Sequence, residues 1–104
     1  MHIQIITFQL NDLSLKAFEA HVETVAPAFA LLPGLAAKYW LCDPEHNIYG
    51  GVYLWRDRAA MEAYQATELF ARLTNSTHYT QLTVRDFAIF ERPTRITRGL
   101  GTPS

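Results

Sequence analysis

The order of apolar and polar side chains predicts four β-strands along the chain. Residues 2–10, 35–42, 47–55 and 80–90 are rich in β-branched, aromatic and other apolar side chains, and turn-forming residues bound them. Apolar side chains occupy both faces of the first strand, so we expect other elements to pack on each side of it. Only a few turn residues separate the second and third strands, which predicts an antiparallel hairpin.

Two other segments have the three- and four-residue spacing that is typical of an amphipathic helix. The first covers residues 15–29, and we expect Pro27 to kink or end it because proline lacks a backbone donor. The Leu-Pro-Gly sequence at residues 32–34 predicts that the helix has ended by this point. The second helix is expected over residues 58–73, although its apolar phase slips near Thr67.

The resulting order, β-α-β-β-α-β, is that of the ferredoxin-like split unit, an α+β fold with one antiparallel sheet and two helices on one face. We assign this domain to residues 1–92. Residues 93–104 contain prolines and glycines and are expected to form a C-terminal loop or arm. Gly50 and Gly51 lie inside the third strand, which suggests a bulge or the close approach of another backbone.

A sheet with helices on one side leaves its other face uncovered. We expect the helices to cover Ile6, Phe8, Val52 and Leu54. The uncovered face then carries the following apolar, aromatic and basic side chains: Ile3, Ile5, Lys38, Trp40, Tyr53 and Trp55. The opposite parity of the second strand would place Tyr39 there instead of Trp40. In either case the face carries too many aromatic side chains to remain exposed to water. We therefore expect a second copy of the chain to cover it about a two-fold axis.

Composition supports this expectation and excludes several classes of protein. Hydrophobic residues make up 49% of the 104 residues and aromatic residues 12%, whereas only 18% are charged, which is below the usual share of about 25%. The net charge of −1 gives no electrostatic basis for binding nucleic acid. Prolines and a glycine interrupt the apolar run at residues 24–37, so no membrane span is expected. The single cysteine, Cys42, cannot form an intrachain disulfide, and we expect a cytoplasmic protein.

An ordered set of short motifs resembles the YdhR-like mono-oxygenase family. The set comprises Pro-Gly-Leu and Lys-x-Trp within residues 32–40, Gly-Gly-x-Tyr-Leu-Trp-x-Asp within residues 49–57, and Ala-Tyr at residues 63–64. Residues 71–75 and the Phe-x-x-x-Glu-x-Pro ending at residues 87–93 extend the resemblance over most of the chain. The family belongs to the dimeric α/β-barrel superfamily. The resemblance therefore implies a homodimer, a ligand cavity and mono-oxygenase activity.

Four candidate ligand-contacting residues lie on neighbouring strands. Lys38 and Trp40 are two residues apart and share a strand face, where an ammonium could bind a phenolate or carboxylate while the indole packs on an aromatic ring. Alternatively, Lys38 forms a salt bridge at the barrel rim and Trp40 belongs to the dimer core. Tyr53 is a candidate proton donor to a developing enolate, and Trp55 is a candidate substrate contact. Both could instead be packing residues.

Two further candidates carry charge or a titratable ring. Arg85 lies in the last strand and requires an anionic partner, which is either the substrate or a glutamate across the dimer. His78 precedes that strand and is a candidate general base at the cavity mouth. The histidines lack metal-ligand spacing and His, Asp and Glu do not cluster, so we expect no metal. No phosphate-binding motif is present in the sequence.

These observations together favour a cofactor-independent mono-oxygenase acting on a small hydrophobic or aromatic, polyketide-like substrate. Such a reaction requires a substrate carbanion that is generated in a dry pocket beside oxygen. A cyclase or isomerase on the same scaffold, or a non-catalytic ligand-binding or stress-response protein, would use the same kind of pocket. Haem degradation is disfavoured because the first-strand asparagine of the haem-degrading relatives is replaced here by Thr7 and Gln9.

Overall fold

The computed structural model describes residues 1–99, and a four-stranded antiparallel sheet organises them. The strands are β1 (His2–Leu10), β2 (Leu35–Asp43), β3 (Ile48–Trp55) and β4 (Tyr79–Ala88). Their spatial order is β2-β3-β1-β4, and every neighbouring pair is antiparallel. The ferredoxin-like α+β fold expected from the sequence is confirmed, with two helices between β3 and β4 instead of one.

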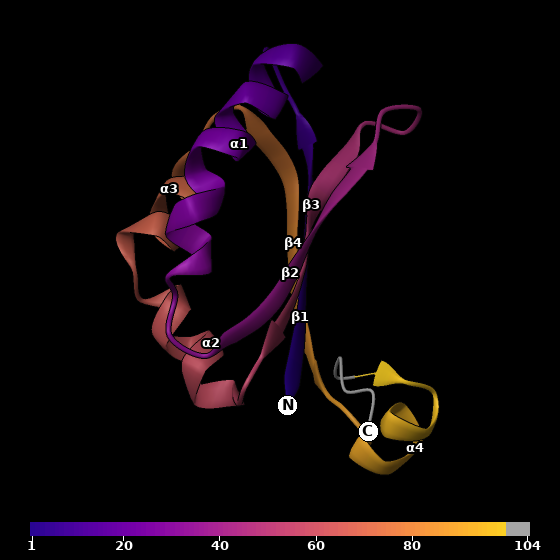
Figure 1. Ribbon diagram of the computed structural model, residues 1–104. Helices are drawn as coiled ribbons and strands as arrows, with labels where there is room; N and C mark the ends of the chain where they lie inside the picture. Colours follow the sequence, from indigo (N-terminus) through magenta and orange to yellow (C-terminus); the bar gives the residue numbers. More distant parts are fainter. Residues whose placement is uncertain (100–104) are drawn as a thin grey trace.

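Three helices lie on one side of the sheet, as Figure 1 shows. They are α1 (Leu15–Ala30), α2 (Arg58–Gln65) and α3 (Glu68–Asn75). A fourth helix, α4 (Glu91–Ile96), lies apart from them at the end of the sheet where the chain begins. None of the helices in the described part of the chain is long and apolar enough to cross a membrane.

The first helix continues through Pro27 and ends three residues later at Ala30. Of the two outcomes expected at Pro27, a kink or an end of the helix, the end is wrong. Proline removes only one intrahelical hydrogen bond, and the last turn is held by Phe29, which is buried against the aromatic rings of Trp40 and Tyr53. The stop at residues 32–34 is confirmed.

The second predicted helix is divided at Thr67, where the apolar phase slips. The Thr67 hydroxyl donates to the Tyr64 carbonyl at 2.6 Å and accepts a hydrogen bond from the backbone N–H of Phe70 at 3.3 Å. This side chain thus caps the start of α3 immediately after α2 has ended. After this break α2 packs against β1 and β3, whereas α3 packs against β4.

The sheet register corrects the predicted parity of β3. Because Ile6 pairs with Gly51 and Gln4 pairs with Tyr53, the odd-numbered positions of β3 face the helices together with Ile6 and Phe8. Val52 and Leu54 therefore lie on the uncovered face, and the prediction that the helices cover them is wrong. The expectation for Ile6 and Phe8 is confirmed, since both are buried.

The same register moves four predicted residues from the uncovered face to the helix side. Lys38 pairs with Tyr53, and Trp40 pairs with Gly51, so both share the face of Tyr53 and Trp55. Tyr39 is 69% exposed on the uncovered face, as the alternative parity of β2 required. The error has a physical reason: both faces of β2 and β3 are apolar, so alternation alone could not decide which face meets the helices.

The uncovered face is apolar and only partly shielded. Its half-buried and exposed apolar side chains come from all four strands: Ile3, Ile5, Tyr39, Val52, Leu54 and Phe87. The predicted presence of Ile3 and Ile5 on this face is confirmed. The part of the chain that the structure describes supplies no element that covers the middle of this face (Figure 1).

Gly50 allows β3 to approach β1 closely. Its φ of +147° is a conformation that side chains rarely adopt, and a Cβ atom there would lie 1.9 Å from the Ile6 carbonyl oxygen. The close backbone approach predicted from the double glycine is therefore confirmed.

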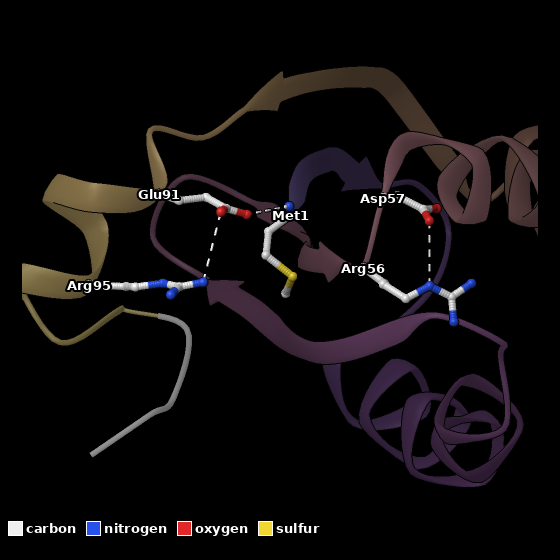
Figure 2. A network of polar contacts seen from close by, with 5 residues as sticks. All are labelled: Met1, Arg56, Asp57, Glu91 and Arg95. Atoms are coloured by element: carbon white, nitrogen blue, oxygen red, sulfur yellow. Dashed lines mark hydrogen bonds and ion pairs between the residues drawn. The ribbon is translucent and has the colours of Figure 1, made fainter. Parts of the chain in front are cut away.

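The C-terminal segment is joined to the start of the chain by charges (Figure 2). The Met1 ammonium lies 3.3 Å from the Glu91 carboxylate, which also pairs with Arg95 at 3.8 Å within α4. Residues predicted to be a loop or arm thus include a short helix up to Ile96. Figure 2 also shows Arg56 beside Asp57, whose carboxylate caps α2 by accepting the Ala60 N–H at 2.8 Å.

Candidate active site

A cavity of about 360 Å³ lies between the sheet and the helices. Side chains of β1, α1, β2, β3 and α3, and of the segment leading into β4, line it. The wall is mostly aromatic and aliphatic: Ile6, Phe8, Leu13, Phe18, Val22, Val25, Phe29, Trp40, Leu69, Leu73 and Tyr79. Its polar groups lie in two regions, with Lys38 and Tyr53 in one and His21, Arg72, Ser76 and His78 in the other. Within residues 1–99, no group of three or more His, Cys, Asp or Glu side chains could hold a metal.

Lys38 reaches into a box of aromatic rings. Its Nζ atom lies 3.3 Å from the ring centroid of Trp40, 3.4 Å from that of Phe29 and 4.5 Å from that of Tyr53. Gly51 provides the space, since a Cβ there would lie 2.8 Å from the Lys38 Cε atom. The predicted salt bridge of Lys38 is not found among the ion pairs of residues 1–99.

This environment changes the acid–base chemistry of the amine. Burial lowers the pKa of Lys38 from 10.5 to about 6, because the ammonium loses its hydration without gaining a carboxylate. The negative faces of the rings attract the ammonium and act in the opposite direction. Above about pH 6 the side chain is therefore mainly a neutral amine, which can accept a proton or attack an electrophile.

Tyr53 is the second polar residue in this region, and its ring centroid lies 4.5 Å from the Lys38 Nζ atom. Its ring is 2% exposed, and its Oη atom lies 3.3 Å from that of Tyr64, which is also buried. Burial, and secondarily the neighbouring Tyr64, raises the pKa of Tyr53 far above its usual value. Burial likewise raises the pKa of Tyr64 to about 12. Tyr53 therefore remains a phenol, which suits a hydrogen-bond donor and excludes a role as a base near neutral pH.

His78 lies in the other polar region of the cavity. Its Nδ1 atom is 3.1 Å from the backbone carbonyl oxygen of Asn11. A carbonyl only accepts, so Nδ1 carries the hydrogen, and Nε2 of the neutral ring keeps its lone pair. The contact with Asn11 holds His78 beyond the end of β1, whereas Lys38 lies level with Tyr53, which pairs with Gln4 near the start of β1. The two groups thus occupy different parts of the cavity.

Two predicted site residues do not line the cavity. Trp55 is fully buried, stacks on Tyr53 with the rings 9° from parallel, and donates from Nε1 to the Gln4 side-chain oxygen at 3.0 Å. Arg85 pairs with Ile5 and therefore lies on the uncovered face, where its guanidinium is 5.2 Å from the Phe87 ring centroid. Lys38, Trp40, Tyr53 and His78 are the predicted residues that the fold brings to one cavity.

Phe29, Tyr64 and Gly51 contribute to the site and were not among its predicted residues. The sequence placed Phe29 on the apolar stripe of the first helix, but the stripe does not indicate which ring will meet a lysine on a distant strand. Tyr64 is part of the Ala-Tyr motif of the family resemblance. Gly51 was attributed to backbone packing, whereas the structure shows that its missing side chain makes room for Lys38.

The chain belongs to the family described as "Putative mono-oxygenase ydhR", whose model matches residues 3–100. The family resemblance noted in the sequence is thereby confirmed. None of the curated proteins matches the chain.

Solved structures with the same fold include oxygenases of low sequence identity. An antibiotic biosynthesis monooxygenase is 21% identical, with a TM-score of 0.71, and the match covers 86% of this chain and 99% of that one. A variant of SnoaB, a cofactor-independent oxygenase from Streptomyces nogalater, is 18% identical, with a TM-score of 0.69 and coverage of 86% and 93%. At these identities the likeness establishes the fold.

A third structure with this fold contains a porphyrin. A variant of MhuD with two manganese protoporphyrin IX molecules per active site is 16% identical, with a TM-score of 0.67 and coverage of 86% and 94%. In the present chain Thr7 bonds Thr83 at 2.7 Å on the uncovered face, and neither Thr7 nor Gln9 lines the cavity. The first strand therefore gives the cavity no polar side chain in this region that could serve such a group.

Proposed function

We propose that the protein is a mono-oxygenase that uses neither a metal nor a flavin and oxidises a small aromatic, polyketide-like ketone. The observation that carries the proposal is the amine of Lys38, which has a lowered pKa and lies in an aromatic box on the wall of an apolar cavity. A ketone flanked by aromatic rings fits this wall and has an acidic C–H bond next to its carbonyl. The family match and the SnoaB-like fold support the same reaction class.

In the proposed first step, the Lys38 Nζ lone pair accepts the proton from the carbon next to the carbonyl. The electron pair of the broken C–H bond passes into an enolate, and the new ammonium lies beside this anion. Tyr53 donates its O–H hydrogen bond to the enolate oxygen. The aromatic side chains around Nζ displace part of its surrounding water, which strengthens both interactions.

Dioxygen is the co-reactant of the proposed second step. The enolate carbon gives its electrons to O₂, forming a C–O bond, and protonation gives a hydroperoxide. Loss of water then converts this carbon to a carbonyl, so a CH₂ group and O₂ become C=O and H₂O. His78, with its free Nε2 atom, is the candidate group for proton exchange in the other region of the cavity.

We also propose that the active protein is a homodimer. The apolar side chains of the uncovered face, among them Tyr39 at 69% and Phe87 at 42% exposure, would be buried by a second copy. In that assembly, Arg85 would lie in the interface and require an anionic partner there. Light scattering at micromolar concentration should give twice the chain mass of 11.8 kDa, and the monomer mass would contradict the dimer.

The exposed thiol of Cys42 is consistent with a reducing compartment, and we propose that the protein acts in the cytoplasm. Fractionation of the cells that produce it would test this assignment. Recovery of the protein outside the cytoplasm would contradict it.

Oxygen consumption tests the proposed activity directly. With anthrone as substrate, we expect one O₂ consumed for each anthraquinone formed, at the same rate with and without a metal chelator. Oxygen uptake that a chelator abolishes would contradict the metal-free reaction. Quenching of tryptophan fluorescence by anthrone without any turnover would favour a ligand-binding protein instead.

A cyclase or isomerase is the second candidate, because the Lys38 amine and the Tyr53 hydroxyl together can move a proton without oxygen. Turnover of a polyketide-like ketone under nitrogen would favour it. Turnover that requires oxygen would favour the mono-oxygenase.

A further inference from the structure

We infer that Lys38 is also a covalent capture site for aldehydes and reactive ketones, which it binds as an imine through its Nζ atom. This activity needs no oxygen, so it goes beyond the proposed mono-oxygenase reaction. The ligand class is a carbonyl compound that carries an aromatic or other flat apolar group.

The geometry around Nζ distinguishes this amine from a surface lysine. Phe29 and Trp40 place their ring faces 3.4 and 3.3 Å from it, and none of the ion pairs in residues 1–99 includes it. A carboxylate partner would hold the amine protonated and occupy it. The rings offer no carboxylate to form an ion pair with it, and burial favours the neutral form by lowering the pKa to about 6.

The cavity provides room for the carbonyl partner. Its volume of about 360 Å³ borders Lys38, Trp40 and Tyr53 directly, so a flat ligand that lies beside these side chains could bring its carbonyl carbon to Nζ. The phenol of Tyr53 stays protonated, because burial raises its pKa, and it can donate to the carbonyl oxygen. The apolar wall also limits the access of water, which would hydrolyse the product.

The reaction is balanced without a further reactant. The Nζ lone pair forms a bond to the carbonyl carbon, and the π pair of C=O moves to the oxygen. The nitrogen loses one proton and the oxygen takes up one, which gives a carbinolamine. The nitrogen then loses its second proton as the C–O bond breaks, and water leaves. The product is a C=N bond between Lys38 and the ligand, together with one molecule of water.

The sequence provides an internal control, because the chain contains only two lysines. Lys16 lies in the first turns of α1 and is exposed, with no aromatic ring over its amine among the described contacts. The remaining amine, the N-terminus, pairs with Glu91 at 3.3 Å. Each amine lies in a different part of the sequence, so peptide mapping separates their products.

The test is reductive trapping of the native chain with benzaldehyde and sodium cyanoborohydride at pH 7 under nitrogen, followed by mass spectrometry of peptides. We expect a benzyl group on Lys38 at a rate at least about tenfold above that on Lys16, and a ratio near one when the chain is unfolded in urea. Equal or slower labelling of Lys38 in the native chain would overturn the inference. Because both lysines are compared within one molecule, the result does not depend on whether a variant folds.

A Lys38→Arg variant provides the second measurement. It keeps a long nitrogen-bearing side chain at this position but cannot form an imine, so only the Lys38 product should disappear while labelling of Lys16 is unchanged. Persistence of a benzyl group on the Lys38-containing peptide would overturn the assignment to Nζ. Trapping on Lys38 together with an absence of oxygen uptake with anthrone would support the imine site and contradict the proposed mono-oxygenase. A failure of the imine inference can thus be told apart from a failure of the proposed function.

Discussion

Lys38 and Arg85 lie on opposite faces of the same sheet, and each has its basic group over an aromatic ring. Lys38 is enclosed by three rings and lines a cavity, whereas Arg85 is exposed and lies over Phe87 alone. An amine that loses its hydration can lose its proton, but a guanidinium remains charged in any protein environment. The helix-covered face can therefore perform proton chemistry, whereas the uncovered face offers a fixed charge amid apolar surface that suits contact with another molecule.

The largest expected effect comes from replacing the two basic side chains in turn. Lys38→Met should lower oxygen uptake with anthrone by about 10²–10⁴-fold, because it removes the proposed base. Arg85→Met should change the rate far less, since Arg85 does not line the cavity. Lys16→Met is the matched control for loss of a lysine. Equal losses in the Lys38 and Arg85 variants would break the distinction between the two faces.

The second largest expected effect is on the stability of the packing between the helices and the sheet. Phe29→Ala should lower the free energy of unfolding by about 3–5 kcal/mol, because Phe29 is 7% exposed and contacts Trp40, Tyr53 and Tyr64. Leu31, two residues later, is 83% exposed, and Leu31→Ala should change the free energy of unfolding by about 0.5 kcal/mol or less. Urea unfolding at one protein concentration measures both. A small loss for Phe29→Ala would mean that the aromatic box is not part of the folded core.

The pH dependence of stability is the smallest of the expected effects when it is measured over a single pH unit. The pKa of Lys38 is about 6 in the folded chain and near 10.5 when unfolded, so the unfolded chain binds more protons between these values. Stability should therefore rise as pH increases above about 6, by at most about 1.4 kcal/mol per pH unit from this group. Lys38→Met should lack this part of the slope, as urea unfolding across that pH range would reveal. Parallel slopes in the two proteins would contradict an unpaired, buried amine.

Local chemistry made several elements of the fold predictable. β1 has the expected bounds, and the stop at residues 32–34 agrees with the end of α1 at Ala30. Even the division between α2 and α3 left a signal, since the apolar phase slips at Thr67, whose hydroxyl caps α3. Pro27 shows the limit of such rules, because contacts of the neighbouring Phe29 with distant strands stabilise the last turn.

The candidate site was only partly predictable. The two-residue spacing indicated correctly that Lys38 and Trp40 share a face, and likewise Tyr53 and Trp55. It did not indicate that this face lies under the helices, because β2 and β3 carry apolar side chains on both sides. The sequence could not show that Trp55 and Arg85 lie outside the cavity. Whether a strand residue lines the cavity depends on the sheet register and on where α1 and α3 pack.

By itself the sequence determined the strands, the main helices, their ferredoxin-like order and an excess of aromatic side chains, because spacing and turn chemistry act over a few residues. Only the tertiary structure decided what those aromatic rings do. The pairing of Gln4 with Tyr53 and of Tyr53 with Lys38 turned the rings toward α1 and enclosed an amine among them. The acid–base property of Lys38 arises from that enclosure, since desolvation depends on residues that are distant in the sequence and meet only in the fold.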